Sequence, residues 1–114
     1  MQENLSVNYK IKTIPNFDSA LKRLAKKFPS LKTEYIALLD SLEANPRQGK
    51  AIGNNCFKIR FAITSKGKGK SGGARVITYV IARDTTVFLL DIYDKSEQNN
   101  ISDKELKQLI SAIK

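Results

Sequence analysis

The stretch that decides the fold is Phe57-Lys58-Ile59-Arg60-Phe61-Ala62-Ile63-Thr64, in which large apolar residues alternate with polar or small ones. Successive side chains of a β-strand point to opposite faces of a sheet, so this pattern predicts a strand with one buried face. Lys58 and Arg60 then lie side by side on the other face. Two neighbouring cations on a strand are candidates for binding phosphate.

Two more strands are predicted downstream of this one. Val76 to Ala82 is apolar on both faces, as in a central strand, and Val87 to Tyr93 follows the turn Arg83-Asp84-Thr85. Strands this close in sequence most simply form an antiparallel meander. Arg75 opens the second strand, so we expect it to join the cationic face.

An N-terminal strand is predicted from the alternation of Val7, Tyr9 and Ile11 with polar residues, and it ends before Pro15. Two amphipathic helices should follow and form a hairpin, with Asn16 and Ser30 as their N-caps. The segment 47–55 is then predicted to be a loop.

At the other end of the chain, Ser102-Asp103-Lys104-Glu105 matches a capping box and predicts a C-terminal helix. The order strand, helix, helix, three strands, helix (β-α-α-β-β-β-α) predicts one α+β domain over residues 1–114, with helices packed on a mainly antiparallel sheet.

The charge of the chain is concentrated in its middle third. Lys and Arg number 20 against 11 Asp and Glu, a net charge of +9. No acidic residue occurs between Ala44 and Arg83. That segment holds the cations Arg47, Lys50, Lys58, Arg60, Lys66, Lys68, Lys70, Arg75 and Arg83. Such a block favours nucleic acid as the partner, with an anionic membrane surface or an acidic protein as alternatives.

A basic glycine-rich connection, residues 66–73, joins the first two meander strands. Its Lys66, Lys68 and Lys70 are candidate contacts for an RNA backbone, although a loop kept basic for solubility has the same composition. A nucleotide-binding P-loop is disfavoured, because Thr64 stands where that motif requires its first glycine and a strand follows instead of a helix.

Several classes of protein are disfavoured by what the sequence lacks. It contains no His and a single cysteine, Cys56, which is expected to be a buried thiol. We therefore predict no metal and no cofactor. The absence of a long apolar run predicts a cytoplasmic protein without membrane contact. Chemistry carried by Lys, Arg and Tyr remains, and on RNA the 2′-OH supplies the nucleophile.

Four runs together resemble the HigB branch of the RelE-type toxins. They are Phe57 to Ala62, Lys66 to Ile77, Leu89-Leu90-Asp91-Ile92-Tyr93-Asp94-Lys95-Ser96-Glu97, and the Ser-capped Lys104-Glu105-Leu106 helix. The resemblance covers about residues 57–113. It implies a microbial RNase fold, ribosome-dependent mRNA cleavage without a metal, and a cognate antitoxin, commonly a helix-turn-helix protein of the HigA type.

The resemblance also implies roles for particular residues. Lys58 would act as base or phosphate ligand, Arg60 and Arg75 would stabilise the transition state, Tyr93 would be the acid, and Lys95 would contact phosphate. Crowded like charges tend to lower the pKa of a lysine, which suits Lys58 as a proton acceptor. Two alternatives stay open: a ParE-like gyrase inhibitor of the same architecture, and a non-catalytic RNA-binding or phage accessory module.

Overall fold

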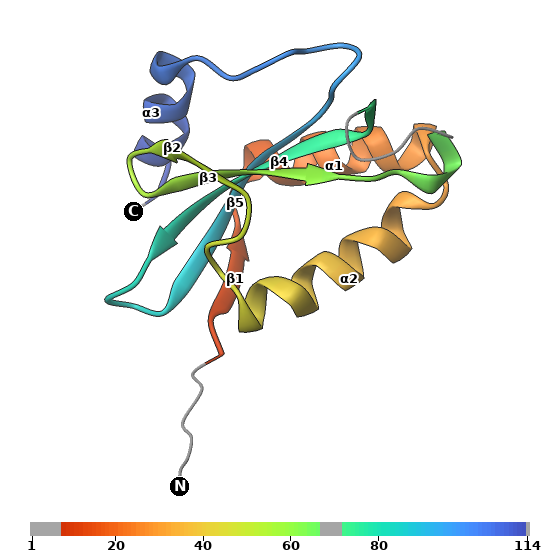
Figure 1. Cartoon of the computed structure of the whole chain (residues 1–114). Helices are drawn as coiled ribbons and strands as arrows, with labels where there is room; N and C mark the ends of the chain where they lie inside the picture. Colours follow the sequence, from red (N-terminus) through yellow and green to blue (C-terminus); the bar gives the residue numbers. More distant parts are fainter. Residues whose placement is uncertain (1–7, 67–71, 114) are drawn as a thin grey trace, which may run out of the picture.

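The computed structural model describes residues 8–66 and 72–113. In this part of the chain, three α-helices and one short 3-10 helix accompany a five-stranded sheet (Figure 1). The elements in chain order are β1 (Lys10–Thr13), α1 (Pro15–Lys27), α2 (Leu31–Ala44), β2 (Lys50–Gly53), β3 (Cys56–Phe61), η1 (Thr64–Lys66), β4 (Ala74–Ile81), β5 (Thr86–Asp94) and α3 (Asp103–Ser111).

The sheet has the strand order β1-β5-β4-β3-β2. Neighbouring strands run antiparallel except β1, which lies parallel to β5. The predicted α+β class and the mainly antiparallel sheet are confirmed. So is the central position of β4, whose consecutive residues Val76 and Ile77 are both completely buried.

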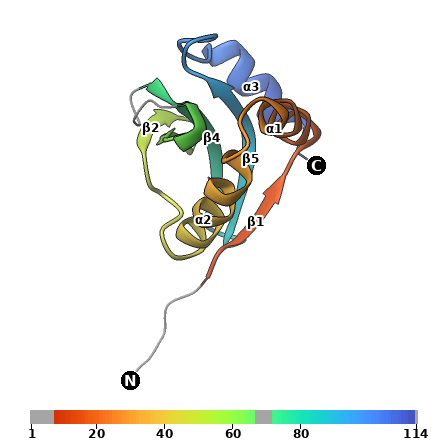
Figure 2. The ribbon, with the colours of Figure 1, turned by 90° about the vertical axis from the view of Figure 1, so that its right-hand side faces the viewer.

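The helices cover the sheet from both sides. α1 packs against β5 and α2 lies beside β1 (Figure 2), and their apolar residues join Ile59 and Phe61 in one core cluster. α3 lies on the opposite face near the turn between β2 and β3 (Figure 1), where the Asp103 carboxylate accepts from Asn54 Nδ2 at 3.3 Å. Its Leu106 lines a hollow together with Lys58 of β3. Part of that opposite face stays uncovered, and the cations of β3 lie there.

One prediction about the strands was wrong, because the segment 47–55 is not a loop throughout. It contains β2, which forms a hairpin with β3. The turn residues Asn54 and Asn55 have φ values of 57° and 62°. Asparagine tolerates this left-handed conformation, and a two-residue turn with two positive φ angles suits the twist of a hairpin.

The helix starts also differ in part from the predictions. α1 begins with Pro15 after an Ile14 N-cap, and the side chain of Asn16 instead donates to the Leu90 carbonyl at 2.9 Å. Ser30 precedes α2 but makes no capping bond. The capping box of α3 is confirmed, since the Ser102 side chain accepts from the Glu105 amide and the Glu105 side chain accepts from the Ser102 amide.

Candidate nucleic-acid interface

Strand register brings the cations of the middle third onto one face of the sheet. Lys58 of β3 pairs with Lys50 of β2, and Arg60 of β3 pairs with Arg75 of β4. Directly opposed residues share a face, so these four side chains lie on the face opposite the buried Ile59. The predicted grouping of Lys58, Arg60 and Arg75 is therefore present in the fold.

These side chains surround a hollow of about 560 Å³, which we call the cationic hollow. It is lined by Gln48, Gly49, Lys50, Lys58, Ile59, Arg60, Arg75, Lys95 and Asn99. Five of these residues are cationic and none is acidic. A concave site with one sign of charge focuses its field on a ligand of the opposite charge, so the hollow suits a phosphate backbone.

Lys58 lies at the centre of the charge cluster. Its pKa is lowered first by partial burial and then by the charges of Lys50, Arg75, Lys95 and Arg60. This agrees with the expectation that crowded cations make Lys58 easier to deprotonate. Its Nζ donates to Asn100 Oδ1 at 3.3 Å, which orients the side chain.

The pKa of Lys58 should respond to its cross-strand neighbour. We expect the exchange Lys50→Gln to raise the pKa of Lys58 towards its ordinary value, because a repelling charge is removed. Titration of the Lys58 13Cε chemical shift would measure the change, with the distant exchange Lys12→Gln as control. An unchanged Lys58 pKa in Lys50→Gln would contradict the charge coupling described above.

The two arginines of the hollow are held differently. Arg75 is only 5% exposed, and its Nη1 donates to the Ala74 carbonyl at 3.1 Å. Arg60 is exposed. A buried guanidinium has a fixed position, whereas an exposed one is able to follow a ligand. Arg75 therefore suits a fixed contact with a bound anion, and Arg60 suits a contact that adjusts to it.

Two backbone contacts shape the rim of the cationic hollow, one between Gly49 and Lys58 and one between Gly73 and Lys95. Gly49 has a φ of +95°, and a Cβ built there would lie 2.5 Å from the Lys58 carbonyl oxygen. Only glycine fits that position. Beyond the end of β5, the Lys95 amide donates to the Gly73 carbonyl at 3.0 Å, and Lys95 Nζ donates to Asn99 Oδ1 at 3.0 Å. These contacts place Lys95 at the hollow, as expected.

Tyr93 pairs with Arg75 across β4 and β5 but does not line the hollow. The residue is 4% exposed, and within the described residues its buried hydroxyl has no hydrogen-bond partner. Burial raises the pKa of Tyr93 more than the charge of Arg75 lowers it. Tyr93 therefore lies beside Arg75 on the same sheet face, buried and outside the lining of the hollow.

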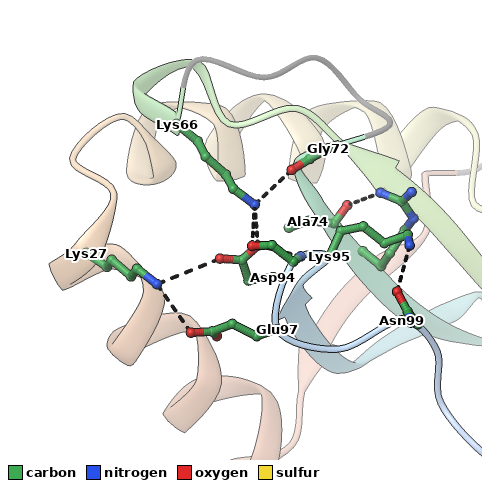
Figure 3. A network of polar contacts seen from close by, with 10 residues as sticks. Lys27, Lys66, Gly72, Ala74, Asp94, Lys95, Glu97 and Asn99 are labelled. Carbon is green, nitrogen blue, oxygen red and sulfur yellow. Dashed lines mark hydrogen bonds and ion pairs between the residues drawn. The ribbon is translucent and has the colours of Figure 1, made fainter.

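Lys66 is turned away from the hollow and into a buried network (Figure 3). Its Nζ pairs with the Asp94 carboxylate and also donates to the Gly72 carbonyl at 2.8 Å and to Ser96 Oγ at 3.1 Å. Burial alone raises the pKa of Asp94, but hydrogen bonds from Lys66 and Ser96 outweigh it and hold the pKa at about 2. We therefore leave Lys66 out of the candidate RNA contacts. Lys68 and Lys70 lie outside the described residues.

Comparison with known proteins adds a family to this geometry. The family model for the RelE toxin of the RelE / RelB toxin-antitoxin system matches residues 21–114. The chain belongs to the RelE toxin family. The match is to RelE toxins in general, and membership of the HigB branch stays a prediction.

Solved structures of RelE toxins share the fold. An arginine-to-alanine double mutant of E. coli RelE in the free state aligns with a TM-score of 0.60 and 19% identity, over 94% of this chain and 99% of that one. The toxin of the RelBE2 toxin-antitoxin complex from Mycobacterium tuberculosis aligns with a TM-score of 0.59 and 19% identity, over 81% and 97%. At this level of identity the likeness supports the fold of a RelE toxin alone.

Sequence reasoning missed part of the cationic hollow. Lys50, Gln48 and Gly49 were assigned to a loop, so their place beside Lys58 was not foreseen. The signal that could have found them is the pair Asn54-Asn55 directly before the alternating strand, because an Asn-rich two-residue turn predicts a hairpin.

The remaining expectations concern the thiol, metals and membranes. Cys56 is 1% exposed, and burial raises its pKa to about 12, so the predicted buried thiol is confirmed. Within residues 8–66 and 72–113, the Cys, Asp and Glu side chains form no group of three that could hold a metal ion. None of the described helices combines the length and the apolar character needed to span a bilayer.

Proposed function

We propose that this RelE family toxin is a ribosome-dependent endoribonuclease that cuts translated mRNA without a metal ion. The observation that carries the proposal is the cationic hollow, where five cations and no carboxylate meet on one sheet face. RNA is favoured over DNA because RNA brings its own nucleophile, the 2′-OH, next to the phosphate. A protein without histidine then needs only to position the 2′-OH next to the phosphorus, to neutralise the charge that develops on the phosphate, and to assist proton transfer.

In the proposed reaction, the 2′-OH loses its proton and attacks the adjacent phosphorus, while the bond to the 5′-oxygen breaks. The products are a 2′,3′-cyclic phosphate and a 5′-OH, to which a proton is added. Lys58, whose pKa is lowered, serves as base or phosphate ligand. Arg60 and Arg75 stabilise the charge on the phosphorane, and Lys95 holds a neighbouring phosphate. Tyr93 donates the proton to the leaving 5′-oxygen, which requires its buried hydroxyl to become accessible to the RNA.

The proposal includes a protein inhibitor. The matching family is defined by RelE / RelB toxin-antitoxin systems, and the Mycobacterium tuberculosis relative was solved as a complex with its antitoxin. We therefore expect a cognate antitoxin for this chain, of the helix-turn-helix HigA type. Expression of the toxin alone should arrest bacterial growth. Co-expression of a neighbouring reading frame that encodes a small helix-turn-helix protein should relieve that arrest.

Primer extension in a translation extract tests the nuclease. We expect the purified protein to cut an mRNA with a start codon and to leave the same mRNA intact when the start codon is mutated. The fragments should carry a 5′-OH, so their ligation requires prior phosphorylation. Failure to cut either mRNA would contradict the proposal.

Two alternative functions have their own tests if neither mRNA is cut. Inhibition by this protein of the supercoiling activity of gyrase would indicate a ParE-like toxin. RNA binding with steep salt dependence but no cleavage would indicate the non-catalytic module.

A further inference from the structure

A second, smaller hollow of about 270 Å³ adjoins the cationic hollow, and we call it the α3 hollow. It shares Lys50 and Lys58 with its neighbour. Its other lining residues are Ile52, Asn100, Ile101, Asp103 and Leu106. The volume lies near the lower end of the range for small-ligand pockets, which suits a single ring system and not an extended strand.

The lining of the α3 hollow differs in kind from that of the cationic hollow. Ile52 is partly buried, Ile101 is 9% exposed and Leu106 is 2% exposed, so these three side chains form a packed apolar wall. The capping box at Ser102 and Glu105 fixes the start of α3 between Ile101 and Leu106. An apolar wall at this place suits the flat face of a nucleobase better than a phosphate.

Besides the shared lysines, the polar groups of the α3 hollow are the Asn100 amide and the Asp103 carboxylate, and Asp103 is its acidic lining residue. Asp103 is about two-thirds exposed, with Oδ1 3.3 Å from Asn54 Nδ2 and Oδ2 3.2 Å from Lys107 Nζ. A carboxylate has about four lone-pair sites, so it can accept further bonds from a ligand. Asn100 Oδ1 accepts from Lys58 Nζ at 3.3 Å, and Lys58 together with Lys50 lines both hollows, so the two sites adjoin each other there.

We propose that the α3 hollow binds the nucleobase beside the cleaved phosphate and that Asp103 selects bases carrying an exocyclic amino group. The inference rests on the proposed function and specifies its substrate. With the phosphate in the cationic hollow, the attached nucleotide reaches the apolar wall past Lys58. The Asp103 carboxylate then accepts from the amino group of guanine, adenine or cytosine. Uracil has no such group and binds less well.

Cleavage mapping tests this selection. Primer extension over a long translated mRNA should place most cuts beside guanine, adenine or cytosine, with uracil about tenfold less frequent than its share of sites. The isosteric exchange Asp103→Asn should reduce this preference to less than twofold while the protein still cuts. Asp84→Asn is the matched control, because Asp84 is an exposed aspartate outside both hollows, and it should leave the preference unchanged. An unchanged preference in Asp103→Asn would overturn the inference.

A binding measurement separates this inference from the nuclease proposal, because it needs no cleavage. The free protein is titrated with 3′-GMP and 3′-IMP, which differ only in the amino group of the base. We expect 3′-GMP to bind about tenfold more tightly and to shift the methyl signals of Ile52, Ile101 and Leu106. Asp103→Asn should abolish the difference. Equal affinities for the two nucleotides, or shifts confined to the cationic hollow, would refute the base site whether or not the protein cuts mRNA.

Discussion

We expect the exchange Arg60→Ala to lower the rate of mRNA cleavage about 100-fold to 1,000-fold and to leave the fold intact. Arg60 pairs with Arg75 across β3 and β4, and both residues line the cationic hollow. Loss of one donor that stabilises the charge developing in the transition state typically costs this much. Because Arg60 is exposed, its removal should change the free energy of unfolding by no more than about 0.5 kcal/mol. Single-turnover cleavage of ribosome-bound mRNA measures the effect.

Arg83→Ala is the control for this prediction. It removes the same charge from an 89% exposed arginine that does not line the hollow. If the two variants lost activity equally, net charge alone would explain the loss, and the hollow would have no special role. Thermal unfolding of both variants would check that the fold is retained. Arg75 is a poorer choice for this test because its side chain is buried.

Much of the fold follows from local patterns in the sequence. Alternation over residues 57–63 fixed which side of β3 is buried, and the two-sided apolar run of β4 placed it in the sheet centre. The parallel pairing of β1 with β5 was not predictable in this way. It joins segments about 75 residues apart, and nothing in the short β1 sequence specifies its partner or its direction.

The candidate site was predictable only where strand positions decide it. Lys58, Arg60 and Arg75 come together because β3 and β4 are neighbouring antiparallel strands, and their register places these residues on one face. Lys66 shows where composition misleads, since it stands beside a basic loop yet points into the protein. Its partner Asp94 lies 28 residues away, and a carboxylate that distant is invisible to a reading of local charge. The density of cations along the sequence therefore predicted which segment forms the candidate interface. Pairing between residues distant in sequence determines which of these cations are available to it.

We expect the exchange Lys66→Met to lower the free energy of unfolding by about 3 kcal/mol and the melting temperature by about 10 °C. The Lys66 side chain is 10% exposed and that of Asp94 is 1% exposed, so the exchange leaves a buried carboxylate without its main partner. Lys27 is a poor substitute, because its Nζ lies 3.9 Å from Asp94 and its side chain is 54% exposed. Chemical denaturation at neutral pH measures the loss. Lys27→Met is the matched control and should cost less than about 1 kcal/mol.

The pH dependence of stability tests whether Asp94 causes the stability loss expected for Lys66→Met. In the native protein the pKa of Asp94 is about 2, below its ordinary value of 3.8, so its stabilisation is complete above about pH 4. It is lost as the pH falls towards 2, by about 2 kcal/mol. In Lys66→Met, burial raises the pKa of Asp94 and the main opposing contact is gone, so this acid-dependent loss should disappear. If the variant lost stability over the same pH range as the native protein, the ion pair would not be the source of the effect, and Lys66 would act through packing alone.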